Sequence, residues 1–180
     1  MRRRGVAVLF GAAAGVYLLD RATKAWAERR LPGRPIEVVT GVLTLRFTTN
    51  SGGAFSLGER SPWVFVAATV VVSILIVATA FRHRRPLASA ALGLVLGGAL
   101  GNLTDRIVRG PRLSGRVVDF VDLHVWPVFN VADSAIVVGA IILVASSFME
   151  GRTRPRPAAD HPDEHTVERD DGREERAGAS

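Results

Sequence analysis

The chain has 180 residues, 48% of them hydrophobic, and a formal net charge of +6, which fits one domain by length. It contains no cysteine, which excludes disulfides, thiol catalysis and thiolate metal sites. An isoelectric point near 11.2 is also found in nucleic-acid-binding proteins. Here the arginines flank long apolar runs, which indicates a membrane protein and no nucleic-acid partner.

Charge and hydropathy divide the chain near residue 150. Residues 1–150 carry 17 basic and 9 acidic residues around long apolar runs, whereas residues 151–180 carry 6 basic and 8 acidic residues and almost no large apolar side chains. A segment of the second kind buries too little apolar surface to offset its ordering entropy. We therefore expect a membrane-embedded domain at 1–150 and a disordered, charged tail at 151–180.

The first apolar run, at residues 5–19, follows a basic start. A signal peptide has a similar beginning, but Asp20, Arg21 and Lys24 follow the run directly, so we expect a retained helix. Asp20 and Lys24 are four residues apart in the acid-first order that stabilises helices. The pair indicates either an ion pair at a helix end or a lysine general base.

The segment after the first helix has a different pattern. Proline and glycine at 32–35 end the helix, and the apolar stretches at 36–39 and 42–47 predict two short strands. The loop at 50–56 contains two adjacent glycines, which allow a positive φ or a close approach to another backbone. By itself this loop is also consistent with a plain turn.

Three further apolar runs, at 62–81, 87–104 and 129–149, are close to the length of a membrane span. The pattern predicts an all-α membrane protein with four transmembrane helices and a small β-element between the first two. Both termini then share one side with the basic turn at 82–85, and the positive-inside rule makes that side cytoplasmic. The opposite loops hold more basic residues in total, so this orientation depends on charge density.

Four spans bring polar residues from distant parts of the sequence to one membrane face. These are Asp20, the loop at Asn50, Asn102, Asp105, Asp119, Asn130 and Asp133. Carboxylates next to lipid are costly and indicate a functional site. Asn102 and Asp105 are three residues apart, as are Asn130 and Asp133, so each pair shares a helix face.

Two carboxylates held close together share one proton, so one can activate water while the other protonates a leaving amine. Asp20 and Asp105 adjoin basic residues in the sequence, whereas Asp119 and Asp133 lie among apolar ones. An apolar setting raises the pKa of a carboxyl, so Asp119 and Asp133 are the better candidates. From the residues alone, two unrelated polar groups at a membrane surface are an equally good interpretation.

Other functions fit the pattern less well. A zinc site lacks ligands, because there is no HExxH motif and His124 is the only histidine at this face. A serine hydrolase would pair Lys24 or His124 with a loop serine, but no GxSxG motif is present. A proton carrier predicts acids spread through the membrane depth, and a scaffold protein leaves the Asn/Asp spacings unexplained.

Five short motifs follow one another along the chain. They are Asp20-x-x-Thr23-Lys24, Asn50-x-Gly52-x-Ala54-Phe55, Gly101-Asn102-x-x-Asp105-Arg106, Val117-Val118-Asp119-Phe120 and Phe129-Asn130-x-Ala132-Asp133. In this order they resemble the motifs of the lipoprotein signal peptidase family, also called signal peptidase II. Gly53 stands where the family more often has alanine. The resemblance covers about residues 1–150 and leaves out the tail.

The resemblance implies a membrane aspartic endopeptidase with four transmembrane helices and a small extracytoplasmic sheet. Such an enzyme cuts bacterial prolipoproteins before a diacylglyceryl-modified cysteine and uses no cofactor or metal. By this resemblance Asp119 and Asp133 become the catalytic pair. The residues that shape the site or hold substrate are Asn50, Gly52, Asn102, Arg106 and Asn130, and those that support it are Asp20, Lys24 and Asp105.

The resemblance also sets expectations for location and partners. The protein is expected in the bacterial cytoplasmic membrane, with both termini and the tail in the cytoplasm and the active site near the extracytoplasmic face. Its expected partners are diacylglyceryl-modified prolipoproteins and membrane lipid, and it is expected to be a monomer.

Overall fold

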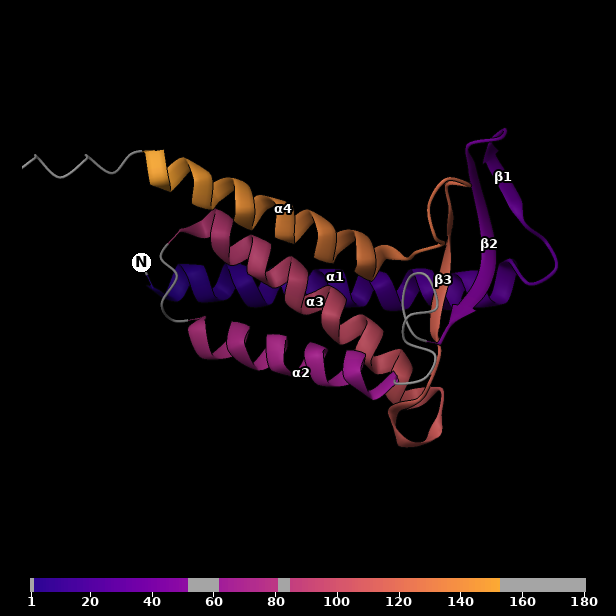
Figure 1. Cartoon of the computed structure of the whole chain (residues 1–180), viewed down its shortest axis with the longest axis horizontal. Helices are drawn as coiled ribbons and strands as arrows, with labels where there is room; N and C mark the ends of the chain where they lie inside the picture. Colours follow the sequence, from indigo (N-terminus) through magenta and orange to yellow (C-terminus); the bar gives the residue numbers. More distant parts are fainter. Residues whose placement is uncertain (1, 52–61, 81–84, 153–180) are drawn as a thin grey trace, which may run out of the picture.

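A helical bundle with a small sheet across one end makes up the computed structural model, which describes residues 2–51, 62–80 and 85–152 (Figure 1). Within these ranges the α-helices are α1 (Arg2–Arg30), α2 (Pro62–Thr79), α3 (Pro86–Val108) and α4 (Val131–Arg152). The strands are β1 (Ile36–Val39), β2 (Leu43–Asn50) and β3 (Val117–Asp122), and a short 3-10 helix, η2, covers Pro111–Leu113. The fold is therefore mostly helical, as expected.

The helices have the length and composition of membrane spans. Among the described residues, α1, α3 and α4 are long and apolar enough to cross a membrane, and α2 is apolar over the shorter stretch Val66–Thr79. Large aliphatic side chains on their outer faces, such as Leu18, Ile74 and Ile141, are at least 60% exposed. An apolar exterior of this extent is expected of a protein surrounded by lipid.

Glycines allow α3 to lie directly against both α1 and α4. A methyl group at Gly97 would lie 2.5 Å from the carbonyl oxygen of Ala13 on α1, and one at Gly98 would clash with the carbonyl of Ala132 on α4. Small residues at such contacts are typical of helices packed in lipid. Helix α3 is therefore the central helix, and its end near the sheet lies between α1 and α4.

The two strands expected after the first helix are present. They join through a turn in which Gly41 has a φ of +72°, a conformation that favours glycine. The β-element is larger than expected, however, because β3 from the connection between α3 and α4 pairs antiparallel with β2. Nearly all residues of β3 are buried, and two of its six residues are aspartates. The segment therefore has no alternation of apolar and polar residues from which a strand could be predicted.

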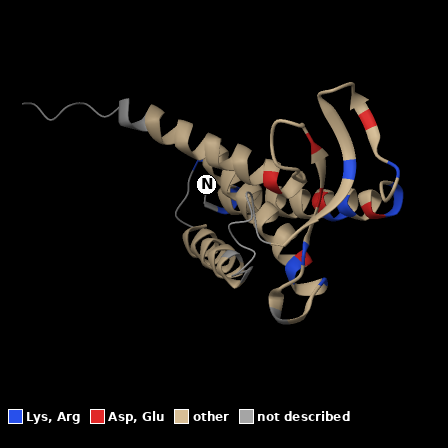
Figure 2. Ribbon diagram, turned by 45° about the vertical axis from the view of Figure 1, so that its right-hand side comes forward, with Lys and Arg blue, Asp and Glu red and all other residues tan. Residues whose placement is uncertain are grey.

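The sheet packs on the end of α1. Phe120 of β3 is buried together with Ala27 of α1 and with Leu31, which directly follows that helix, and Leu45 of β2 joins this cluster. The pairing of Thr48 with Asp119 then fixes where the β3 carboxylate lies. In Figure 2 the acidic residues coloured red lie at this end of the bundle.

Candidate active site

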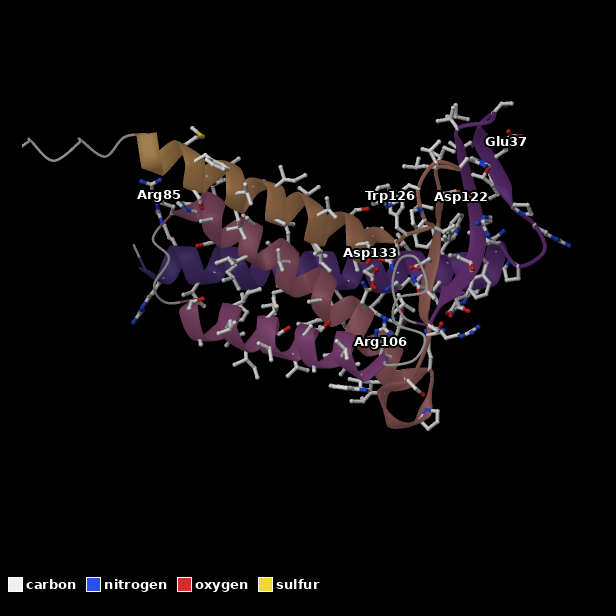
Figure 3. The ribbon with its side chains drawn as sticks, in the orientation of Figure 1. Glu37, Arg85, Arg106, Asp122, Trp126 and Asp133 are labelled. Atoms are coloured by element: carbon white, nitrogen blue, oxygen red, sulfur yellow. The ribbon has the colours of Figure 1, made fainter. Side chains whose placement is uncertain are left out.

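Polar side chains from α1, α3, β3 and α4 meet where the sheet crosses the helix ends. Figure 3 shows Arg106 and Asp133 at this end of the bundle, while Arg85 lies at the opposite end. The guanidinium of Arg106 interacts electrostatically with the carboxylates of Asp119 and Asp133. The convergence of distant residues that the sequence predicted is therefore present.

Asn130 and Asp133 form a reciprocal cap at the start of α4. The backbone N–H of Asp133 donates to Asn130 Oδ1 at 3.0 Å, and the backbone N–H of Asn130 donates to Asp133 Oδ2 at 3.2 Å. This is the arrangement of a capping box, which satisfies amides that a helix leaves unpaired. The cap holds the Asp133 carboxylate at the first turn of the helix.

Asp119 lies on β3 and is only 2% exposed. Its Oδ1 atom accepts a hydrogen bond of 2.6 Å from Asn130 Nδ2, and the side chain of Asn50 also hydrogen-bonds to it. Burial, together with repulsion from the Asp133 carboxylate, raises the pKa of Asp119 to about 7. Asp119 can therefore hold or release a proton near neutral pH.

Asn130 connects the two carboxylates. Its Nδ2 atom donates to Asp119, while its Oδ1 atom and backbone N–H form the cap with Asp133. Asn102 of α3 approaches Asp133 from the other side and donates from Nδ2 to Asp133 Oδ1 at 2.8 Å. Two carboxylates with different surroundings are thereby held near each other, the arrangement in which a proton can be shared.

Lys24 on α1 lies behind this pair and is fully buried. Its Nζ atom is 2.9 Å from Asp20 Oδ2, 2.9 Å from Asp105 Oδ2 and 2.8 Å from Asn102 Oδ1. The ion pair of Asp20 with Lys24 is therefore present, and the amine has no position open for a substrate. Asp20 also accepts the backbone N–H of Ala132 at 3.1 Å, which ties α1 to the first turn of α4.

Asp105 joins three segments through its carboxylate. Besides Lys24 it accepts hydrogen bonds from Arg21 at 2.5 Å, from Arg109 at 2.9 Å and from the backbone N–H of Val118 at 3.3 Å. The last bond anchors β3 next to Asp119. Asp105 thus ties α1, α3 and β3 together.

Arg106, Gly52 and the nearby acid Asp122 differ in how they relate to this network. Arg106 donates from Nη1 to the carbonyl oxygen of Ser51 at 3.3 Å, while Gly52 lies outside the described residues. Asp122 is held away from the pair, because Arg46 Nε donates to it at 2.5 Å and the N–H of His124 at 2.8 Å. The hydrogen bond from Arg46 is the main reason that the pKa of Asp122 is lowered.

Sequence reasoning missed several members of this network. Arg21 and Arg109 bind Asp105 from α1 and from the end of α3, and only the helix packing brings them together. The cap at Asn130 and Asp133 was detectable, since an Asn followed three residues later by an acid before an apolar run is a helix-start pattern. Over the described residues, no three His, Asp or Glu side chains are placed to hold a metal ion.

A pocket of about 380 Å³ opens beside Asp133. It is lined by Leu123, Trp126, Phe129, Asp133, Ser134, Val137 and Val138. Apart from Asp133 and Ser134 these side chains are apolar. The carboxylate of Asp133 is therefore accessible from a space that suits an apolar group.

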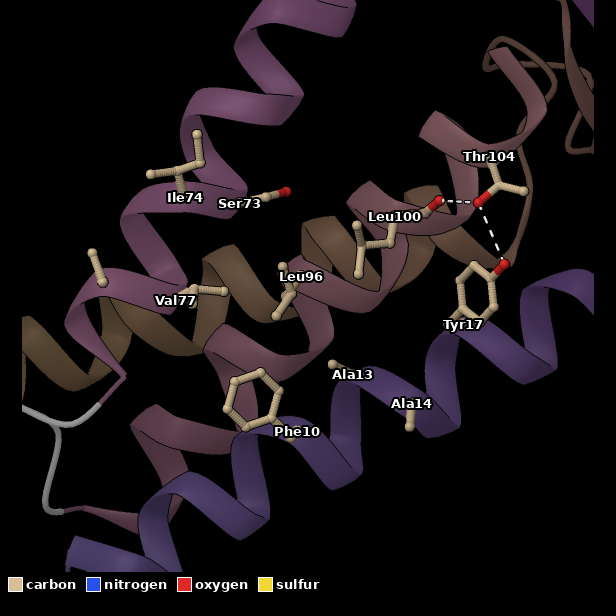
Figure 4. Close-up of a pocket in the computed structure, with 11 residues that line it drawn as sticks. Phe10, Ala13, Ala14, Tyr17, Ser73, Ile74, Val77, Leu96, Leu100 and Thr104 are labelled. Carbon is tan, nitrogen blue, oxygen red and sulfur yellow. Dashed lines mark hydrogen bonds between the residues drawn. The ribbon is translucent and has the colours of Figure 1, made fainter. Parts of the chain in front are cut away.

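A larger apolar groove of about 800 Å³ runs between α1, α2 and α3. Figure 4 shows Phe10, Leu96 and Leu100 along it, with the hydroxyl oxygens of Tyr17 and Thr104 3.4 Å apart at one end. Thr104 lies on α3 between Asn102 and Arg106. The groove thus ends one helical turn or less from the polar network.

The chain is similar to known proteins of one family. The sequence profile of the family described as signal peptidase (SPase) II matches residues 12–149. A lipoprotein signal peptidase of Rhodococcus jostii is 46% identical over 139 residues, which are 76% of this chain and 70% of the relative. One from Streptomyces coelicolor is 47% identical over 150 residues, 81% of this chain and 72% of the relative.

A solved structure has a similar fold. A bacterial membrane enzyme determined by the in meso method at 2.3 Å resolution superposes with a TM-score of 0.72 at 25% identity, covering 82% of this chain and 92% of that chain. The five motifs, the polar network and these relatives agree, and the chain belongs to the signal peptidase II family.

Proposed function

We propose that this protein is a membrane aspartic endopeptidase that removes the signal peptide from bacterial prolipoproteins by cutting before the diacylglyceryl-modified cysteine. The family assignment supports the reaction. The observation that carries the site is the bridge by Asn130, which hydrogen-bonds to Asp119 and caps α4 together with Asp133 at the mouth of an apolar pocket. Asp119 and Asp133 are therefore proposed as the catalytic pair.

The proposed reaction uses one ionised and one protonated carboxyl group. The ionised group takes a proton from a water molecule whose oxygen attacks the scissile carbonyl carbon, while the protonated group gives its proton to the carbonyl oxygen. As the tetrahedral intermediate collapses, one hydroxyl group returns its proton to the dyad, the C–N bond breaks, and the amine leaves with the other proton of the dyad, which restores the starting pair. No metal is needed, since the pair supplies both the acid and the base.

Other polar groups are proposed to shape the site. Asn50, Asn102 and Asn130 hold the two carboxylates through their amide groups. Arg106 is only 7% exposed and interacts electrostatically with both acids. A guanidinium there can meet a peptide or lipid carbonyl oxygen. Gly52, which lies outside the described residues, is proposed from the resemblance as a residue that shapes the site or holds substrate.

The lipid part of the substrate is proposed to occupy the groove of Figure 4. Its lining is almost wholly apolar, and it lies between helices that have the composition of membrane spans. The groove leads toward Thr104, on the helix that carries Asn102 and Arg106. An acyl chain in this groove would therefore leave the attached cysteine near the carboxylates.

We further propose that α2 is the fourth membrane span, since it is apolar and packs beside α3. Both termini would then be cytoplasmic and the active site would face the extracytoplasmic side. The dyad and its hydrogen-bond partners come from one chain, so a monomer suffices.

Residues 1–150 are proposed as the peptidase domain. Removal of residues 157–180 should therefore leave cleavage of the precursor intact. A large loss of cleavage by a truncated protein that still folds would contradict this.

Cleavage of a purified diacylglyceryl-modified precursor tests the proposal. The wild type is expected to cut it and to ignore the unmodified precursor, while folded Asp119→Asn and Asp133→Asn variants should be inactive. Asp122→Asn is the matched control, since Asp122 lies on the same strand as Asp119 but pairs with Arg46. Activity in either dyad variant, or none in the wild type, would refute the proposal.

A further inference from the structure

The buried amine of Lys24 reaches the proposed dyad through one side chain. An ammonium group has three N–H donors and no acceptor. The three acceptors around Lys24 Nζ are Asp20 Oδ2, Asp105 Oδ2 and Asn102 Oδ1, all within 2.9 Å. Every donor of Lys24 thus has a partner, and one of these partners belongs to the active site.

This contact determines which way the Asn102 amide faces. An amide presents an oxygen on one side and an NH₂ group on the other. Because Lys24 can only donate, the oxygen of Asn102 must face Lys24, and the NH₂ group then faces Asp133, where Nδ2 lies 2.8 Å from Oδ1. Asn130 Nδ2, 3.2 Å from the same amide oxygen, favours the same orientation.

Asp133 therefore accepts hydrogen bonds at both carboxylate oxygens. Oδ1 accepts from Asn102, and Oδ2 accepts from the backbone N–H of Asn130. Its position in the first turn of α4 also favours a negative charge, because the helix dipole is positive there. Hydrogen bonds to the charged form of a carboxyl group stabilise that form.

We infer that Lys24 is a positioning residue that acts through Asn102 to keep Asp133 as the ionised member of the pair, so that Asp133 accepts the proton of the attacking water and Asp119 holds the shared proton. This inference rests on the proposed function. The raised pKa of Asp119 agrees with it, since a carboxyl with a pKa of about 7 is largely protonated in mildly acidic solution. Lys24 thereby gains a role beyond supporting the fold.

The charged groups facing Asp133 come from three elements. They are Lys24 from α1, Arg106 from α3 and Asp119 from β3. Without Lys24, the Asn102 amide can turn its oxygen toward Asp133, and one positive charge is lost. Ionisation of Asp133 then requires a higher pH, so the acidic limb of the pH–rate profile should move upward.

The experiment compares the pH dependence of kcat/KM for lipid-modified precursor in Asp20→Asn and in the double variant Asp20→Asn/Lys24→Met. Removing Lys24 alone leaves the buried carboxylate of Asp20 without its cation, which is strongly destabilising. In the double variant, the amide oxygen introduced at position 20 can still accept the Ala132 N–H, while Asp105 keeps Arg21, Arg109 and the Val118 N–H. Both variants are checked for folding by thermal unfolding in detergent.

The acidic limb of the double variant is expected to lie higher than that of Asp20→Asn by on the order of one pH unit. Arg21→Gln is the matched control, because Arg21 also donates to Asp105 but has no bond to Asn102. It should lower the melting temperature and leave the limb in place. If the role of Lys24 is purely structural, the acidic limb of the pH–rate profile should stay in place in the double variant as it does in Arg21→Gln. That result would overturn the inference.

Asn102→Ala provides a second test that keeps the ions around Lys24 paired. It removes the connecting amide, so the acidic limb should again move to higher pH; an unmoved limb in this folded variant refutes the inference even if the double variant does not fold. The Asp133→Asn variant distinguishes a failure of the proposed function from a failure of the inference about Lys24. If Asp133→Asn stays active, the proposed function itself fails. If Asp133→Asn is inactive but the acidic limb does not move in the double variant or in Asn102→Ala, only the proposed role of Lys24 is refuted.

Discussion

Asn130 and Asp133 hold each other at the start of α4, where the N–H of each backbone donates to the side-chain oxygen of the other at 3.2 and 3.0 Å. The cap leaves Asn130 Nδ2 free to approach Asp119 Oδ1 at 2.6 Å. The side chain of Asn130 therefore both caps the start of α4 and bonds to Asp119 on β3. The geometry of the proposed dyad depends on this shared residue more than on any direct contact between the two acids.

Asn130→Ser should separate capping from the dyad. Serine is a good N-cap residue, so the melting temperature should change little, but its side chain cannot donate to Asp119 as the amide does. Misplacement of Asp119 is expected to lower kcat by on the order of a hundredfold. Ser134→Ala, which removes only a hydroxyl bond to the Asn130 carbonyl, is the control. Equal activity of the two variants would show that the Asn130 bridge is not needed.

Gly97→Ala should destabilise the bundle. Its new methyl group would lie 2.5 Å from the Ala13 carbonyl and 2.8 Å from Val16 Cβ, and such overpacking costs about 1–3 kcal/mol. Gly15→Ala is the matched control, because a methyl group there meets nothing within 4 Å. Thermal unfolding in detergent measures both. A similar melting temperature for the two variants would mean that α1 and α3 are not in close contact at Gly97.

The raised pKa of Asp119 predicts a pH dependence of stability. The folded protein binds this proton with a pKa of about 7 and the unfolded chain with the ordinary value of 3.8. The folded state therefore holds more protons between these values, so its stability falls as the pH rises from 4 to 7. When the pH is raised from 5 to 8, the melting temperature of the wild type should fall further than that of Asp119→Asn.

Asp122 provides the control for that measurement. Its pKa is lowered in the folded state, so the stability it contributes is present above pH 3.8 and is lost only as the pH falls through the lowered value. Asp122→Asn should therefore show the wild-type difference between pH 5 and pH 8. If Asp119→Asn shows that difference too, Asp119 does not titrate in this range.

Filling the groove between α1, α2 and α3 should impair use of the lipid-modified precursor. Ala14 lines the groove, and Ala14→Phe places a large side chain in it. We expect KM for the modified precursor to rise roughly tenfold, equivalent to about 1.4 kcal/mol of binding, with a smaller change in kcat. Leu18→Phe, at a side chain that is 65% exposed, should behave as wild type. An unchanged KM in Ala14→Phe would place the acyl chain elsewhere.

The sequence allowed the family, the main helices and the first two strands to be predicted, because these follow from local patterns. Uninterrupted apolar runs predict helices of membrane length, and the β1–β2 turn has its own glycine signal at Gly41. Asp119 and Asp133 could be chosen because their sequence neighbours are apolar. These inferences use residues within a few positions of one another.

The tertiary structure decided which distant residues touch. Strand β3 pairs with β2 from a connection more than 60 residues later, and the pattern of residues 117–122 has no period that predicts this pairing. The path from Lys24 through Asn102 to Asp133 crosses three helices. This path of hydrogen bonds depends on the close contact of α3 with α1 at Gly97 and with α4 at Gly98. Sequence alone places these residues at one face, but only helix packing determines which donor meets which acceptor.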